Sequence, residues 1–218
     1  MKSFSHIDSK GNFLDKKLYN NFQLFRKHNG IYIEIGANDG IIQSNTLMYE
    51  KYLNWKGILI EPSPNVFEKC KQNRSDKNFF MNCACVEDDN IKTVQGDFNG
   101  NCMSSVNADR VVENKNKMIT ISTKTLTSII NESGFTEIDF FSLDVEGYEL
   151  NVLKGLDFEL YRPKYILIEI YTKDYKNILK FMQEKKYLLH SNFTNYNKKD
   201  NPGWDQTHND YLFIDKNL

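Results

Sequence analysis

An α/β fold with a doubly wound, mostly parallel sheet and helices on both faces is predicted from the sequence of 218 residues. Short apolar runs alternate along the chain with segments of helical periodicity, the pattern of β-α-β units with right-handed crossovers. The first run, residues 32–35, ends in a turn with Gly36 at its start and Gly40 at its end. Acidic residues follow the ends of several runs. Because ligands of open parallel sheets bind beyond the carboxyl ends of the strands, the same pattern predicts where the site lies.

The composition fits one domain over residues 1–218, with residues 1–29 as an N-terminal helical lead-in. Hydrophobic residues make up 40% of the chain, enough for a substantial core. The formal net charge is -1, from 28 basic and 29 acidic residues, which argues against a nucleic-acid partner. No apolar run approaches the roughly 20 residues of a membrane span, and the N-terminus lacks the apolar core of a signal peptide.

The four cysteines, at positions 70, 83, 85 and 102, do not have the paired spacing of a zinc site. Reduced thiols in a cytoplasmic protein are therefore expected rather than disulfides or a metal centre. An Asn-x-Ser triplet such as the one at Asn73 is then a chance match and not a glycosylation site.

The first part of the chain combines a helix, a strand and a second helix. Leucine and phenylalanine at three- and four-residue steps predict an amphipathic helix over residues 14–25 that leads into the first strand. After the glycine turn, Ser44 or Asn45 caps a helix that runs to about residue 52. Pro62 and Pro64 then end the second strand.

The rest of the chain continues this alternation, apart from an irregular insertion or hairpin between residues 86 and 117. That segment holds two short β-prone pieces, at 92–94 and 103–106. Further strands are predicted at 57–61, 78–85, 119–122, 138–144, 165–170, 188–189 and 211–214. Further helices are predicted at 65–74, 126–134, 149–155 and around 178–181.

The glycine turn indicates the class of ligand. Gly36 allows a sharp turn and Gly40 a close approach of the backbone to a ligand or strand. The middle position, which must be glycine if a pyrophosphate is to approach, is Asn38, so nicotinamide and flavin dinucleotides are disfavoured. The acidic strand, with Glu34 before one wide turn, suits a ligand with a ribose and a charged amino-acid tail, which points to S-adenosylmethionine. The alternative is a glycine turn of the kind that any α/β protein carries after a strand.

Three acidic residues mark one edge of the predicted sheet. Asp39, Glu61 and Asp144 each lie at, or just after, the end of a predicted strand. Glu61 comes about twenty residues beyond the turn, where a carboxylate accepts hydrogen bonds from both hydroxyls of a ribose. Its alternative role is to cap the next helix.

Asp144 and Glu146 are the candidate catalytic pair. If the strand continues, both side chains point the same way. A close pair of carboxylates holds one raised pKa, which suits a general base, or binds a hard cation such as Mg²⁺. The base is favoured slightly because no third ligand is clearly placed. The alternative is that Glu146 and Glu149 only favour the N-terminus of the next helix. A polar loop with Trp204 and His208 either covers the acceptor or has no role.

Several of these segments occur in order in a known family. Residues 34–40, 44–46, 55–62 and 143–155 resemble FkbM-type methyltransferases, and the resemblance extends from about residue 30 to about residue 170. It implies a Rossmann-like fold of the class I methyltransferase type and S-adenosylmethionine-dependent O-methylation. It also implies an active-site edge at Asp144 and Glu146. The cofactor-binding residues are then expected to be Glu34, Gly36, Ala37, Asn38, Asp39, Gly40, Asn45, Thr46, Glu61, Pro62, Ala84 and Cys85.

The function predicted is transfer of a methyl group from S-adenosylmethionine to a hydroxyl of a sugar, glycan or related small molecule. A base or a cation must help that hydroxyl lose its proton. Two alternatives stay open: an RNA ribose methyltransferase, and a catalytically inactive binding protein that retains the fold. The near-zero net charge and Glu169, expected after the fifth strand, argue against RNA. The glycine turn, Glu61 and Asp144 argue against an inactive protein.

Overall fold

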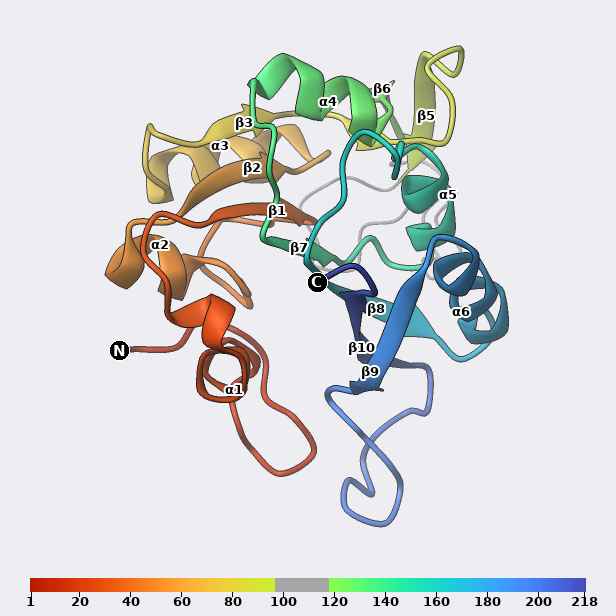
Figure 1. Ribbon diagram of the computed structural model, residues 1–218. Helices are drawn as coiled ribbons and strands as arrows, with labels where there is room; N and C mark the ends of the chain where they lie inside the picture. The colour runs from red at the N-terminus through yellow and green to blue at the C-terminus, as the bar shows by residue number, and fades with distance from the viewer. Residues whose placement is uncertain (97–117) are drawn as a thin grey trace.

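A mostly parallel sheet forms the centre of the protein in the computed structural model, which describes residues 1–96 and 118–218 (Figure 1). Its seven strands have the order β3-β2-β1-β7-β8-β10-β9. All neighbours pair in parallel except β10, which is antiparallel to both β8 and β9. The strands of this sheet are β1 (Ile31–Ile35), β2 (Lys56–Ile60), β3 (Phe79–Met81), β7 (Phe140–Leu143), β8 (Tyr165–Tyr171), β9 (Tyr187–Asn192) and β10 (His208–Asp215).

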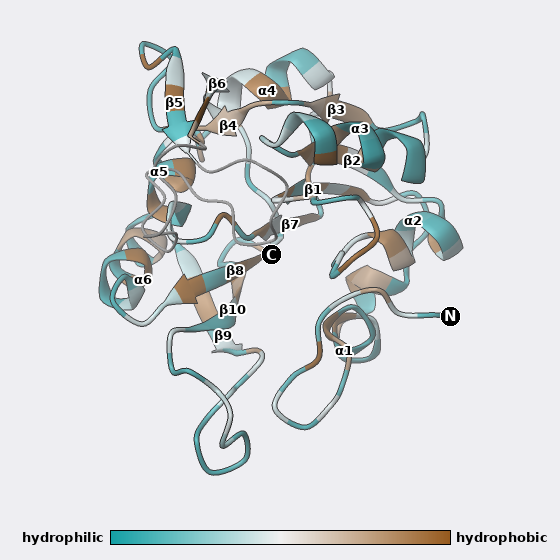
Figure 2. Ribbon diagram, turned by 180° about the vertical axis from the view of Figure 1, so that it is seen from behind, coloured by the Kyte–Doolittle hydropathy of each residue, from teal (hydrophilic) through white to brown (hydrophobic). Residues whose placement is uncertain are grey.

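Helices cover both faces of the sheet, as the sequence predicts. Side chains of successive strand residues point to opposite faces, so Ile33 and Ile35 join one core while Tyr32 joins the other. The first core packs against α4, α5 and α6, and the second against α1, α2 and α3. In Figure 2 apolar colouring follows β1, whereas hydrophilic colouring covers most of α3. The helices are α1 (Leu14–Asn21), the 3-10 helix η1 (Gln23–Arg26), α2 (Leu47–Leu53), α3 (Pro64–Asn73), α4 (Leu126–Ser133), α5 (Glu149–Lys154) and α6 (Tyr175–Glu184).

The third predicted strand, 78–85, is wrong as one element because it is divided between two sheets. Strand β3 ends at Met81, and β4 (Ala84–Cys85) pairs in parallel with β6 (Ile119–Lys124) in a separate three-stranded sheet. The break has a local cause. The side-chain amide of Asn82 donates hydrogen bonds to the carbonyl oxygens of Glu61 (2.8 Å) and Pro62 (3.0 Å), which draws the chain toward the end of β2.

Two other sequence predictions are corrected in detail. The helix expected over 14–25 ends at Asn21, and a short 3-10 helix follows it. The β-prone piece at 92–94 is part of β5 (Thr93–Gly96), which pairs antiparallel with β6 as a hairpin-like unit. The piece at 103–106 lies outside the described residues. Over the described parts of the chain, no helix has the length and apolar character needed to cross a membrane.

A buried arginine ties α3 to the first strand and to the loop after it. The Arg74 side chain is fully buried, with Nη1 3.0 Å from Glu34 Oε2 and Nε 2.9 Å from Glu50 Oε2. Its Nη2 donates to the Tyr32 hydroxyl (2.8 Å) and to Thr46 Oγ1 (2.8 Å). One cation therefore compensates two buried carboxylates and satisfies two hydroxyls, which is the condition for burying such charges at tolerable cost.

Gly40 is required by the same arginine. It has a φ of +81°, and a Cβ at this position would lie 2.8 Å from Arg74 Cγ. The second glycine of the predicted ligand turn thus makes room for a side chain of the protein itself.

We predict that Arg74→Met lowers the free energy of unfolding by about 3–5 kcal/mol, because it leaves Glu34 and Glu50 buried without a cation. Urea denaturation measures the change. The triple variant Arg74→Met/Glu34→Gln/Glu50→Gln should recover part of the loss. Lys69→Met, at an exposed lysine in α3, is the control and should change stability by less than about 0.5 kcal/mol. Equal effects of the two single substitutions would contradict the importance of the buried network.

Candidate active site

A cavity lies at the carboxyl ends of β1, β2 and β7. This is the edge of the sheet where the sequence predicts ligand binding. Most of the predicted site residues line the cavity, namely Gly36, Ala37, Asn38, Glu61, Pro62, Ala84, Cys85, Asp144 and Glu146. The cavity wall also contains residues that the sequence analysis did not select, among them Ile42, Gln43, Val66, Cys83, Tyr148 and Val152. These additions are mostly apolar, a composition typical of small-molecule sites.

Gly36 sets the distance between the ends of β1 and β7. It has a φ of +80°, and a Cβ at this position would lie 1.9 Å from the carbonyl oxygen of Asp144. No side chain fits there. The amides of Gly36 and Ala37 both donate to the carbonyl oxygen of Ile60, each at 3.1 Å, so the turn is also fixed to the end of β2.

Glu61 lies on the β2 side of the cavity with a nearly buried carboxylate. The side chain accepts hydrogen bonds from the amide of Asn38 (3.0 Å) and from the amide of Ser63 (2.8 Å). Burial raises the pKa of Glu61 to about 7, and the two backbone hydrogen bonds oppose that rise. The contact with Ser63, the residue before α3, fits the alternative capping role. The position of the carboxylate in the cavity fits the ribose role.

Five of the predicted cofactor residues lie behind the cavity wall, where they shape the loop between β1 and α2. Glu34 accepts hydrogen bonds from the hydroxyls of Ser44 and Thr46 and from the amide of Asn45. Asp39 accepts from the amides of residues 41 and 42. Direct cofactor contact by these five stays a prediction. They are Glu34, Asp39, Gly40, Asn45 and Thr46.

Ser44 supplies the helix-start contact that the sequence assigns to Ser44 or Asn45. Its hydroxyl accepts hydrogen bonds from the amides of Thr46 (3.3 Å) and Leu47 (3.1 Å) at the start of α2. The Asn45 side chain instead donates to the Ser142 hydroxyl (3.0 Å) in β7. The loop is thus joined to two strands of the sheet.

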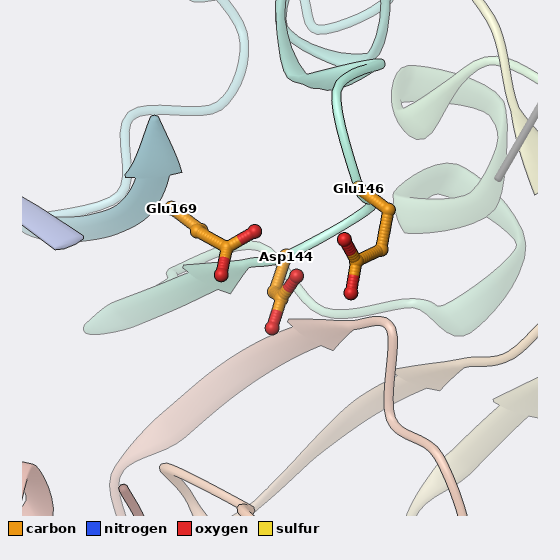
Figure 3. Close-up of side chains that lie close together, drawn as sticks. All are labelled: Asp144, Glu146 and Glu169. Carbon is orange, nitrogen blue, oxygen red and sulfur yellow. The ribbon is translucent and has the colours of Figure 1, made fainter. Parts of the chain in front are cut away.

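Asp144 and Glu146 lie close together, although the predicted reason is wrong. Strand β7 ends at Leu143, and Glu146 has a φ of +58°, so the two residues do not continue a strand. The turn still brings both carboxylates to one place. There they meet Glu169, and oxygens of the three side chains lie within 4.8 Å of one another (Figure 3). Glu169 lies inside β8 and not after it, and the sequence analysis did not select it for the site.

Two further residues contact this acidic group. The Tyr171 hydroxyl donates to Glu146 Oε2 at 2.6 Å, and His208 Nε2 lies 3.3 Å from Glu169 Oε1. His208 belongs to β10 and not to the loop in which the sequence places it, and the Trp204 indole donates to its carbonyl oxygen (3.2 Å). A role of Trp204 and His208 in covering an acceptor stays a prediction.

Glu149 has the structural role that the sequence offers as an alternative. It is the first residue of α5, and its carboxylate accepts hydrogen bonds from the amides of Gly147 (2.9 Å) and Val145 (3.3 Å). Burial raises the pKa of Glu149 to about 7, and these backbone hydrogen bonds oppose the rise. Glu149 therefore closes the turn that carries Glu146.

Comparison with known protein families identifies the family of the chain. The family model described as methyltransferase FkbM domain matches residues 34–189. The chain belongs to the FkbM methyltransferase family. The match begins at Glu34 and includes the glycine turn, Glu61 and the three acidic residues of the cluster. The resemblance inferred from the sequence motifs is confirmed. A search of curated proteins found no match.

Solved methyltransferases share the fold, which confirms the predicted Rossmann-like class I architecture. Methyltransferase FkbM from Methylobacillus flagellatus KT has a TM-score of 0.54 at 15% identity, over 85% of this chain and 43% of that one. The chain thus spans less than half the length of that protein. M. capricolum TrmK, solved with its cofactor product S-adenosyl-homocysteine, has a TM-score of 0.53 at 11% identity. The match covers 94% of this chain and 69% of that one. The METTL16 MTase domain has a TM-score of 0.50 at 12% identity. The match covers 93% of this chain and 64% of that one.

The electrostatics of the FkbM site divide it into two halves. On the β7 side, burial raises the pKa of the Asp144 carboxyl well above its ordinary value, and the negative charges of Glu146 and Asp210 raise it further. Burial and the neighbouring Asp144 raise the pKa of Glu169 in the same direction. On the β2 side, Glu61 is not part of this acidic cluster, and its carboxylate accepts hydrogen bonds from two backbone amides.

We predict that affinity for S-adenosylhomocysteine falls as the pH decreases through about 7. In the predicted site the ribose hydroxyls donate to the ionised Glu61 carboxylate, so we expect the bound form to have the lower pKa and affinity to be complete only above the pKa of the free protein, about 7. Below it, affinity should fall by up to about tenfold per pH unit. Calorimetry between about pH 6 and pH 8 measures this. Glu61→Gln should flatten the profile, and Glu68→Gln, at an exposed position in α3, should leave it unchanged. A wild-type profile without slope would remove Glu61 from the ribose site.

Proposed function

We propose that the chain transfers the methyl group of S-adenosylmethionine to a hydroxyl of a sugar, glycan or related small molecule. One observation carries the proposal: Glu61 and Asp144 line the same cavity from the two strands that flank β1. One carboxylate is then available to a ribose and the other to the reacting hydroxyl. The proposed methyltransferase unit includes the whole chain, with residues 1–29 packed on the second core through α1 and η1.

The cavity wall fits the parts of the cofactor. Glu61 is placed for the ribose hydroxyls, and Ala84 and Cys85 form an apolar wall beside it for the adenine. The turn at Gly36 and Asn38 offers backbone close to the ligand, as an amino-acid tail requires. Bound there, S-adenosylmethionine supplies an electrophilic methyl group on a positively charged sulfur. Lysine and arginine do not occur among the described residues that line the cavity.

Asp144 is the proposed proton acceptor or cation ligand at the reacting hydroxyl. It follows β7 directly, lies against Gly36, and faces the cavity. A sugar hydroxyl is hardly ionised at neutral pH, so a carboxylate must take up its proton or hold a cation that lowers its pKa. The acceptor oxygen must also be held in line with the methyl group and away from water. The Asp144 position meets these needs because it is deeply placed and next to the cofactor turn.

The acidic group argues for an uncharged acceptor. Phosphates of RNA brought to Asp144, Glu146 and Glu169 meet a group of acidic side chains, and the described cavity lining offers no lysine or arginine to attract them, which opposes binding. A neutral hydroxyl does not carry that cost. A small molecule or a glycan is therefore favoured over RNA ribose as the acceptor.

The cofactor assignment predicts selective binding. We expect S-adenosylmethionine and S-adenosylhomocysteine to bind at micromolar concentrations and NAD not to bind. The physical reason is that Asn38 occupies the position that must be glycine for a pyrophosphate to approach. Calorimetry with each of the three ligands measures this. Heat with NAD alone would contradict the cofactor assignment.

Asp144→Asn should lower turnover by about 10²–10⁴, because it keeps the side-chain shape and removes the charge at the reacting hydroxyl. Affinity for S-adenosylhomocysteine should change much less. Labelled S-adenosylmethionine, offered with a panel of oligosaccharides and nucleotide-sugars, measures transfer. Glu159→Gln, at an exposed position, is the matched charge-removing control. Near wild-type turnover by a folded Asp144→Asn protein would exclude Asp144 from the reaction.

A further inference from the structure

We propose that Asp144, Glu146 and Glu169 bind one divalent cation of the Mg²⁺ or Mn²⁺ class beside the acceptor hydroxyl. The catalytic use of this cation depends on the function proposed above, whereas its binding does not. The sequence alone favours a general base because it places two acidic residues and no third ligand. The structure provides Glu169 as that third ligand.

Acidic side chains form a row across β8, β10 and the end of β7. Leu143 pairs with Ile168 in the parallel register of β7 and β8, so the next residues, Asp144 and Glu169, face each other. In the antiparallel register of β8 and β10, Glu169 pairs with Asp210. Side chains directly opposite each other share a face of the sheet, and like charges in such positions destabilise it. A row of this kind needs a counter-charge or shared protons.

One oxygen atom of Glu169 also indicates a bound partner. The residue is 9% exposed, and its Oε2 is a buried oxygen without a hydrogen-bond partner. Figure 3 shows its carboxylate directed toward Asp144. Leaving a buried carboxylate oxygen unpaired is costly, and buried polar atoms in folded proteins almost always have partners. A cation between Glu169 and Asp144 provides such a partner, in competition with a proton shared between the two carboxyls.

The spacing fits a hard cation. Oxygen ligands of Mg²⁺ lie about 2.1 Å from the ion, so they are about 3 to 4.2 Å apart in an octahedral site. The three carboxylates offer oxygens within 4.8 Å of one another, so small side-chain rotations complete the geometry. Tyr171 and His208 contact the outer oxygens of Glu146 and Glu169, as neighbours of metal ligands commonly do. Water and the acceptor hydroxyl are expected to take the remaining positions.

The cation changes the role of Asp144 from base to ligand. An acceptor hydroxyl on the cation has a lowered pKa and releases its proton to water. Its oxygen then forms a bond to the methyl carbon, and the carbon–sulfur bond breaks with its electron pair passing to sulfur. One proton, the methyl ether and the neutral thioether product account for all atoms and charges. The alternative is that the acidic side chains share protons, which also reduces the negative charge of the row. In that case the reaction does not depend on a metal ion.

Metal binding is tested directly, without reference to turnover. The full chain is freed of metal with EDTA, dialysed, and titrated with Mn²⁺ while the free ion is followed by electron paramagnetic resonance. We expect one site per chain, and Glu169→Gln should weaken it by about 10- to 100-fold or more. Glu137→Gln, at an exposed carboxylate, is the control and should bind as the wild type does. Thermal melting checks that each variant is folded.

Two outcomes overturn the cation site: no binding of Mn²⁺ below the millimolar range in the presence of S-adenosylhomocysteine, or equal binding by the wild type and a folded Glu169→Gln protein. If Glu169→Gln does not fold, Glu146→Gln replaces it in the same titration. Methyl transfer that continues in EDTA contradicts the catalytic use of the cation and leaves the methyltransferase function standing. Binding of Mn²⁺ with no transfer to any acceptor supports the site and counts against the proposed function.

Discussion

The parallel pairing of β1 with β2 on one side and β7 on the other fixes the positions of the first residues beyond these three strands. The last residue of β1 pairs with the last residues of both neighbours. The three residues that follow the strands, Gly36, Glu61 and Asp144, therefore lie at one level. A glycine is required in the middle because any side chain would meet the Asp144 carbonyl oxygen. The strand register and the absence of a side chain at Gly36 thus bring the Glu61 and Asp144 carboxylates to opposite sides of a shared cavity.

Much of the fold follows from local sequence signals, whereas the acidic group does not. Strand and helix periodicity, together with Gly36 and Gly40, is enough to predict the sheet and its ligand edge. Glu169 could not be selected in this way, because its place opposite Asp144 depends on the register between strands. Arg74 shows the same limitation, since a basic residue after a helix indicates an exposed position and only tertiary structure reveals its buried partners.

Charge is distributed unevenly between the two sides of the sheet edge. Near the first strand, buried carboxylates are matched by Arg74, which makes that region a rigid support for the loop. Near β7 and β8, Asp144 and Glu169 face each other, and burial raises the pKa of both. Perturbed carboxyl groups of this kind concentrate where proteins bind ligands or perform chemistry. The contrast separates a region of compensated charge around Arg74 from a region of uncompensated acidic groups among the described residues around Glu169.

The position of β10 bears on the order in which the site can assemble. This strand is the last in sequence, yet it lies between β8 and β9 and contributes Asp210 and His208 to the surroundings of Glu169. During synthesis the N-terminal strands leave the ribosome first, so β1, β2 and the turn at Gly36 become available for pairing early. The acidic row closes only when β10, the last strand to be synthesised, pairs with β8. A nascent chain therefore completes the glycine turn at the end of β1 before it completes the acidic group around Glu169.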